Sequence, residues 1–444
     1  MSHKKKFLSP ATVKSSLKSH SYVALWFSAL LYLICISGTI VVFFEEFERL
    51  EQPHISEYSS FPAENIQPAM DEYINRIGEV PLATYIVLPT EGFPRTHITD
   101  GTDEWYLNQD GSFSDSVDTP WTSMLKELHT HLHLPHVIGM TLVGFFGIVL
   151  FSLIISGVLS HPKLFKDLFF LRRNRSHRLK HTDWHNRLSV WGLPFHLMIA
   201  ITGAFIGLSS VLISITALGF FNNDTESVLS AIYGDEPILE SNGGKINYPE
   251  AFRQLEYQSP KAEPIYIVVQ NMGKKDQLLE IAATLPGRLI YSEIYRFNQN
   301  GEFVDKQGMS DGPTGRQASY STYRLHFGHF DSFWVKPLYF IMGLMLSLMA
   351  VYGMNIWFAR RPHRTWLNNA WQGWVWGIPI ALVLSAVTSL VSLNPFIVFY
   401  GSLILILIIN IQYGERFNSL KLMRYLLISS AILLASAVYY SSRS

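Results

Sequence analysis

Seven long stretches of mainly apolar residues constrain this chain more than any other feature of its sequence. A helix that crosses a lipid bilayer needs about 20 such residues, and the stretches approach or exceed that length. We therefore expect a polytopic membrane protein with about seven spanning helices. The predicted spans are Tyr22–Phe44, Val137–Ser160, Leu188–Leu212, Val335–Phe358, Val375–Val391, Pro395–Ile411 and Leu426–Tyr440.

Charged residues are segregated along the chain. The totals are equal, with 35 Lys and Arg against 35 Asp and Glu, so no basic excess favours binding to nucleic acid. Glu45–Glu127 holds 17 acidic and 4 basic residues, and Asp224–Asp331 holds 15 and 10, whereas the N-terminus and the other connections are rich in Lys and Arg. Because Lys and Arg concentrate on the cytoplasmic side, we predict a bacterial inner-membrane protein with a cytoplasmic N-terminus and two periplasmic segments.

Several classes of function are disfavoured by what the sequence contains. Its one cysteine, Cys35, excludes an intramolecular disulfide framework, a cysteine zinc site, an iron–sulfur cluster and a covalently attached c-type haem. The sequence has neither a Gly-x-Gly-x-x-Gly motif before a helix nor a phosphate loop, which argues against a bound nucleotide. It also lacks the sequence patterns of the common hydrolases.

The first four predicted spans repeat one unit twice. His20 lies 18 residues before Gly38, and His185 lies 18 residues before Gly203. The segments between the spans also match, with alternating strand-like residues and an Asn-Gln-x-Gly-type turn in each half. We infer two parallel repeats, each made of a helix, an outer α+β domain and a returning helix. The elements expected in the outer domains are strands at Tyr85–Leu88 and Trp105–Leu107, turns at Gly111 and Gly301, and helices at Pro68–Gly78 and Pro249–Tyr257.

Histidines at the predicted membrane boundaries are candidate cofactor ligands. Ionisable residues at membrane depth usually mark a function, and imidazole is a good axial ligand for haem iron. The repeat supplies an inner pair, His20 with His185, and an outer pair, His129 with His326. His133 with His329 is a second candidate outer pair. His196, about 16 Å deeper than His185 along a helix, either bonds a carbonyl group or ligates the outer haem.

Other polar and small residues have simpler interpretations. A single interfacial histidine is more often solvated or capping than a ligand. Glycines along the spans permit close helix approach, and they would equally leave room for a flat macrocycle. The histidines assigned to solvent or to loops are His54, His97, His131, His136, His161, His177, His181 and His363.

Taken together, the residues resemble the PepSY-associated transmembrane helix family of bacterial inner-membrane proteins. The resemblance covers about residues 10–365. It implies a duplicated unit with two periplasmic PepSY-like domains, and it places His20, His129, His185 and His326 as haem ligands. Some members resemble iron-regulated, di-haem b-type reductases of ferric siderophores. The motifs that carry the resemblance are Ser37-Gly38-Thr39-Ile40, Leu128-His129, Trp184-His185-Asn186-Arg187-Leu188, Trp191-Gly192-Leu193-Pro194-Phe195-His196, Leu325-His326-Phe327-Gly328 and Trp357-Phe358-Ala359-Arg360-Arg361.

The expected fold is therefore an all-α polytopic membrane protein with two small α+β PepSY-like periplasmic domains. Spans five to seven are an addition found in part of the family. The predicted division of the chain is 1–44 (cytoplasmic N-terminus and first span), 45–134 (first periplasmic domain), 135–160 (second span), 161–184 (basic cytoplasmic loop), 185–214 (third span), 215–333 (second periplasmic domain), 334–358 (fourth span), 359–374 (basic cytoplasmic loop) and 375–444 (spans five to seven).

Two functional hypotheses follow. In the first, the protein is an oxidoreductase that conducts electrons from a cytoplasmic or quinol donor, through two non-covalent haem b groups, to a ferric chelate. Reduction to ferrous iron weakens binding by hard oxygen ligands, and the acidic outer segments favour a cationic or neutral chelate. In the second, the protein is not an enzyme, and its outer domains bind or inhibit an envelope protease or another periplasmic partner. The sequence singles out no catalytic residue.

Overall fold

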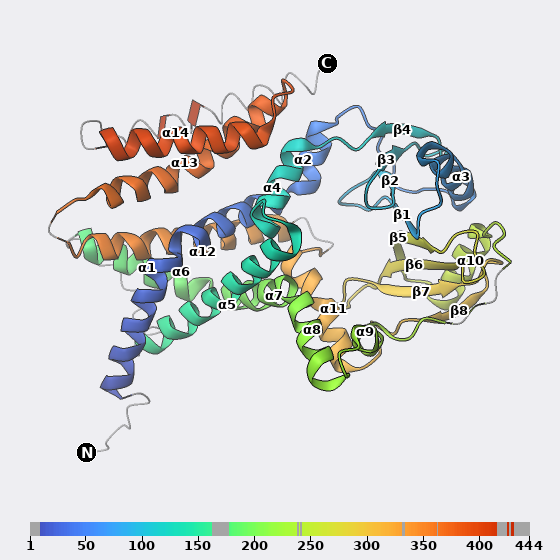
Figure 1. The fold of residues 1–444 in the computed structure, drawn as a ribbon, viewed down its shortest axis with the longest axis horizontal. Helices are drawn as coiled ribbons and strands as arrows, with labels where there is room; N and C mark the ends of the chain where they lie inside the picture. The colour runs from blue at the N-terminus through green and yellow to red at the C-terminus, as the bar shows by residue number, and fades with distance from the viewer. Residues whose placement is uncertain are drawn as a thin grey trace. The chain divides into compact units, whose positions relative to one another are not determined.

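The chain folds into two compact units, which are described separately here (Figure 1). The computed structural model describes residues 9–161, 177–237, 239, 242–330, 334–361, 363–414, 424–425 and 428–429. The helical unit consists of Met1–Phe47, Thr119–Leu208 and Phe333–Ser444, and the sheet unit consists of Glu48–Asp118 and Ser209–Ser332.

The helical unit contains the apolar helices that the sequence predicts. Within the described residues, five helices are long and apolar enough to cross a membrane, and the number is six if a bent pair counts as one span. The seventh predicted span, Leu426–Tyr440, lies almost entirely outside the described residues. The helices of this unit are α1 (Pro10–Val41), α4 (Pro120–His131), α5 (His136–Ser160), α6 (His177–Trp191), α7 (Leu193–Gly207), α12 (Val335–Phe358), α13 (Trp366–Ser389) and α14 (Pro395–Tyr413), and α2 (Phe44–Glu51) follows α1.

The third predicted span is corrected by the structure. Instead of one helix over Leu188–Leu212, the chain forms α6 and α7, which meet at an angle of 70°. The break falls at Gly192, two residues before Pro194. A proline within a helix removes a backbone hydrogen bond and clashes with the preceding turn, so the ladder of α6 ends before it. The residues after α7 form α8 (Ser209–Phe220), which belongs to the sheet unit.

Small residues allow the helices of the helical unit to approach closely. Helix α1 packs against α5 and α12, α6 packs against α12, and α7 packs against α5. At the contact of α5 with α7, a Cβ on Gly147 would lie 2.7 Å from the backbone nitrogen of Ala204, and a Cβ on Gly144 would lie 2.7 Å from the backbone of Gly207. Larger side chains would force these helices apart, which confirms close helix approach as the role of Gly144, Gly147 and Gly207.

The sheet unit is built around one antiparallel sheet of eight strands in the order β4-β3-β2-β1-β5-β6-β7-β8. The first four strands come from the first outer segment and the last four from the second, and β1 pairs with β5 through Tyr85↔Val268 and Ile86↔Ile267. This pairing satisfies the backbone groups of two strands that would otherwise be edges. The strands are β1 (Ala83–Val87), β2 (Thr96–Thr99), β3 (Glu104–Leu107), β4 (Phe113–Ser116), β5 (Glu263–Gln270), β6 (Leu278–Thr284), β7 (Glu293–Phe297) and β8 (Phe303–Lys306).

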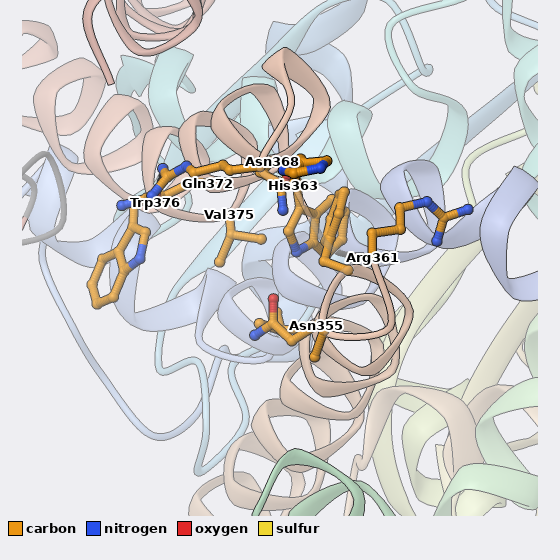
Figure 2. Close-up of a pocket in the computed structure, with 12 residues that line it drawn as sticks. Asn355, Arg361, His363, Asn368, Gln372, Val375 and Trp376 are labelled. Carbon is orange, nitrogen blue, oxygen red and sulfur yellow. Dashed lines mark hydrogen bonds between the residues drawn. The ribbon is translucent and has the colours of Figure 1, made fainter. Parts of the chain in front are cut away.

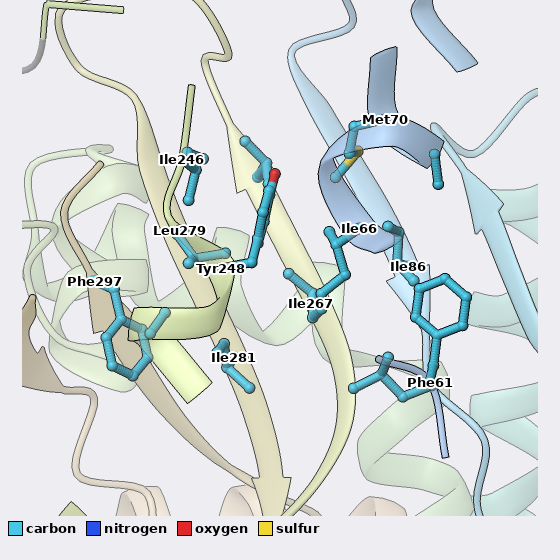
Figure 3. Close-up of a cluster of buried hydrophobic side chains, with 14 of the residues drawn as sticks. Phe61, Ile66, Met70, Ile86, Ile246, Tyr248, Ile267, Leu279, Ile281 and Phe297 are labelled. Atoms are coloured by element: carbon cyan, nitrogen blue, oxygen red, sulfur yellow. The ribbon is translucent and has the colours of Figure 1, made fainter. Parts of the chain in front are cut away.

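One face of this sheet carries a continuous hydrophobic core. Figure 3 shows Ile66 and Met70 on one side of the cluster and Tyr248 on the other, packed over strand residues that include Ile86 and Ile267. These side chains are almost fully buried, so each half contributes one helix and four strands to a shared core. Besides α8, the helices of this unit are α3 (Ile66–Ile77), preceded by a short 3₁₀ turn at Ala63–Asn65, and α9 (Thr225–Tyr233), α10 (Tyr248–Gln258) and α11 (Thr314–Phe327).

Candidate functional site

His20 and His185, which the repeat predicts as a pair, lie next to each other in the helical unit. His20 is on α1 and His185 is on α6, and the centroids of their rings are 6.2 Å apart with an angle of 75° between the ring planes. Both side chains are half-buried. The two halves of the repeat therefore bring equivalent imidazoles to one place.

Each of these rings is held through its Nδ1 atom. Nδ1 of His20 is 3.0 Å from the carbonyl oxygen of Leu153 on α5 and 3.2 Å from Oγ of Ser156. Nδ1 of His185 is 2.9 Å from the carbonyl oxygen of Met349 on α12. Because a carbonyl oxygen only accepts, each Nδ1 carries the proton and donates, which leaves the lone pair of a neutral ring on Nε2. A hydrogen bond of this kind is what orients metal-ligating histidines.

A glycine follows each accepting carbonyl by one helical turn. Gly157 comes four residues after Leu153, and Gly353 comes four residues after Met349. A Cβ on either glycine would lie 3.3 Å from Cε1 of the histidine that it faces. Helix α5 supplies a carbonyl and a facing glycine to His20, and α12 supplies the same two groups to His185. In each case the two groups lie on one helix face, because residues four apart share a face.

His129 uses the same arrangement in a third place. Its Nδ1 donates to the carbonyl oxygen of Ile34 on α1, at 3.0 Å, and Gly38 comes four residues later. A Cβ on Gly38 would collide with the ring of His129. It lies on α4, a helix of 12 residues that belongs to the helical unit, whereas the predicted division placed it in the first periplasmic domain. One accepting carbonyl and one glycine four residues later thus recur around three histidines.

The spacing of the inner pair can be compared with that of two imidazoles that bind one metal ion from opposite sides. Metal–imidazole nitrogen bonds are about 2 Å long, so two rings that bind one ion through Nε2 have centroids roughly 6 Å apart. The separation of His20 and His185 matches that value. In the described part of the chain, Nε2 of neither ring has a protein hydrogen bond, and both Nδ1 atoms are already fixed.

The other two candidate histidines of the helical unit differ in whether a ring nitrogen is left without a protein hydrogen bond. Nε2 of His133 donates to the carbonyl oxygen of Met124 at 2.7 Å, and its Nδ1 is 2.9 Å from Oη of Tyr400, so both ring nitrogens are occupied. His196 is buried, and its Nε2 has no hydrogen-bond partner among the described residues. That nitrogen lies against Gly192, so the break between α6 and α7 makes the space for it.

The predicted outer pair is divided between the two units. His129 belongs to the helical unit, whereas His326, on α11, and His329 belong to the sheet unit. The ring of His329 stacks on Phe327, with centroids 5.5 Å apart. The pairing of His129 with His326 therefore stays a prediction from the repeat.

Sequence reasoning found the histidines but not the groups that fix them. The accepting carbonyls belong to Ile34, Leu153 and Met349, whose side chains give no sign of this role because any residue carries a carbonyl. The glycines were visible, and a glycine that faces a histidine at equivalent positions of a repeat is the signal from which the carbonyls could have been found. Helix α14 also supplies Tyr400 to His133, a contact that no motif indicates.

Comparisons with known proteins identify a family for most of the chain. Residues 17–360 match the family described as "PepSY-associated TM region". The uncharacterized protein PA4219 of Pseudomonas aeruginosa is 25% identical over 257 residues, a match that covers 54% of this chain and 64% of the relative. The chain thus matches less than two thirds of that relative's length, and α13 and α14 lie beyond the family match.

Proposed function

The chain belongs to the family of PepSY-associated TM regions and is a multi-pass membrane protein, and on this basis we propose that it is a haem b oxidoreductase that delivers electrons to a ferric siderophore at the periplasmic face. The observation that supports the proposal most directly is the inner pair of histidines. Their separation of 6.2 Å and their two anchored Nδ1 atoms suit one iron between them.

The helical unit carries three of the four proposed ligands, His20, His129 and His185, whereas His326 belongs to the sheet unit. His20 and His185 would hold the inner haem, and His129 with His326 would hold the outer one. The carbonyl groups of α5, α12 and α1 fix the ring orientation and the tautomer of three of these histidines before any cofactor binds. Because the rings need little reorganisation, the cost of ordering the ligands on binding is reduced.

Haem b supplies one-electron transfer, because its iron is stable in both the ferric and the ferrous state. The predicted topology places the inner pair towards the cytoplasm, where the donor is a cytoplasmic reductant or a quinol. On the opposite side, the acidic excess of the outer segments favours a cationic or neutral chelate as acceptor. Reduction of the chelated iron to the ferrous state lowers the affinity of hard oxygen ligands for it, and the iron is released for uptake.

The proposal is tested by the haem content of purified protein. A pyridine haemochrome assay is expected to give two equivalents for the natural sequence and one for each of the variants His20→Ala, His129→Ala, His185→Ala and His326→Ala. His54→Ala, which removes an exposed histidine of the sheet unit, is the control and retains both. Full haem content in all four variants excludes the ligand assignment. A colourless, folded protein from haem-replete cells excludes the redox function and leaves binding of a periplasmic partner.

A further inference from the structure

A pocket in the helical unit lies between the end of α12 and the start of α13. It has a volume of about 380 Å³, within the range of small-molecule sites, roughly 300–1,000 Å³. Figure 2 shows Asn355 facing Asn368, Gln372 and Val375 across it, with Trp376 at one side. Most of its lining follows residue 360, where the family match ends.

The lining combines flat aromatic walls with neutral hydrogen-bonding groups. Phe358, Trp371 and Trp376 supply rings, and Asn355, Asn368 and Gln372 supply amides. Trp371 is only 8% exposed, and its Nε1 donor is buried with no hydrogen-bond partner among the described residues. An unsatisfied buried donor is costly, so a ligand that brings an acceptor oxygen to this place would gain that bond.

The two arginines at the pocket each donate hydrogen bonds to neutral groups of the protein. Arg364 donates to Oδ1 of Asn369 at 2.8 Å and to Oε1 of Gln372 at 2.9 Å. Arg361 donates to the carbonyl oxygen of Trp357 and lies over its ring. The amide groups and the buried Nε1 donor of Trp371 favour a ligand with carbonyl or hydroxyl groups, whereas the charge of the two arginines makes an anionic head group the alternative that the experiment must exclude.

The pocket and the inner histidine pair lie on opposite faces of the same turns of α12. Gly353 faces His185, whereas Val351 and Asn355, two residues before and after it, line the pocket. Residues two apart on a helix point to nearly opposite sides. A molecule in the pocket is therefore separated from His185 by the width of one helix, about 10 Å.

We propose that this pocket binds the head group of a quinol and is the entry point for electrons. The inference rests on the proposed function and names its donor. Oxidation of one quinol to the quinone breaks two O–H bonds and releases two protons and two electrons, which reduce two ferric chelates by one electron each.

The test measures binding of decylubiquinone to the full-length protein in nanodiscs by calorimetry, with empty nanodiscs as the blank. Trp371→Phe keeps an aromatic ring of smaller size and removes the Nε1 donor, and Asn355→Leu removes an amide. Each is expected to weaken binding about fivefold, the value of one hydrogen bond. Trp366→Phe, on an exposed tryptophan of the same helix outside the pocket, is expected to bind like the natural sequence.

The outcomes separate this inference from the proposed function. Saturable binding that is weakened only by the pocket variants supports the site, even if the protein contains no haem, in which case the redox function alone fails. Absence of saturable binding by a protein with both haem groups overturns the quinol site alone. Equal quinone affinity in all variants also overturns the quinol site. The site is overturned in favour of an anionic lipid if no quinone binds and phosphatidylglycerol co-purifies with the natural sequence but not with Arg364→Gln.

Discussion

His185 donates through Nδ1 to the carbonyl oxygen of Met349 at 2.9 Å, and its ring rests against the backbone of Gly353 one turn further along α12. Helix α12 therefore controls both the tautomer and the position of the imidazole. His20 stands in the same relationship to Leu153 and to the glycine that follows it on α5. The geometry of the inner pair is thus set by two returning helices rather than by the helices that carry the histidines.

The first prediction concerns Gly353→Val. A Cβ at this position already lies 3.3 Å from Cε1 of His185, and the two further methyl groups of valine would push the ring away from His20. We expect loss of one haem equivalent while the fold is retained, measured by haemochrome assay and circular dichroism. Gly401→Val on α14, where a Cβ meets nothing within 4 Å, is the matched control. Equal haem content in the two variants would contradict the role of Gly353.

The second prediction concerns the outer level. Alanine at Gly38 places a methyl group on the ring of His129, which is bonded to the neighbouring turn of α1. We expect Gly38→Ala to lose the outer haem and keep the inner one. A redox titration followed by absorbance would then show one transition in place of two. Retention of two transitions would show that His129 is not a ligand.

The sequence predicts those parts of the fold and of the candidate site that depend on local patterns of residues. Spacing within the repeat predicts that His20 and His185 are equivalent, and the structure brings them together. Apolar stretches likewise predict α1, α5, α12, α13 and α14, because length and hydropathy suffice for such helices. These features follow from local patterns, which a single sequence displays.

Features that depend on distant residues escape such patterns. Hydropathy does not reveal the break at Gly192, because the residues next to it on both sides, Leu188–Trp191 and Leu193–Phe195, are mainly apolar. The pairing of β1 with β5 joins Tyr85 to Val268 across more than 180 residues, and neither strand carries a sign of its partner. The carbonyl groups that fix the histidines belong to ordinary apolar residues and become visible only when the helices pack.

The third prediction concerns an ion-pair cluster in the helical unit. Nζ of Lys336, at the start of α12, is 2.7 Å from Oε2 of Glu45 and 2.7 Å from Oε1 of Glu46. Lys336→Met leaves two adjacent carboxylates without their cation, in a partly buried place, and is expected to cost about 1–3 kcal/mol. The thermal midpoint should fall by several degrees, whereas Lys14→Met, at an exposed site, should leave it unchanged.

A second substitution makes the cause of this loss measurable. Adding Glu45→Gln to Lys336→Met removes one of the repelling charges and should restore part of the thermal midpoint. Additive losses in the double variant would mean that the two residues do not interact. The expected coupling therefore separates a charge effect from lost packing of the lysine side chain.

The fourth prediction concerns the pH dependence of the sheet unit. Arg49 donates from Nε and from Nη2 to the two carboxylate oxygens of Glu57, each at 2.7 Å, and Arg95 adds a weaker bond. The hydrogen bond from Arg49 lowers the pKa of Glu57 in the folded protein. A lowered folded pKa contributes stability that is present above the unfolded value of about 4.3 and is lost as the pH falls through the folded value.

The natural sequence should therefore lose thermal stability between pH 5 and pH 3 more steeply than Glu57→Gln, which has no proton to bind at this position. At pH 5 the variant should be the less stable of the two, because it has lost the charged pair with Arg49. Melting of the sheet followed by far-ultraviolet circular dichroism measures both differences, with the exposed Glu79→Gln as control. Parallel pH profiles for the natural sequence and Glu57→Gln would contradict this prediction. They would show that the carboxylate of Glu57 does not contribute to the acid sensitivity of the sheet unit.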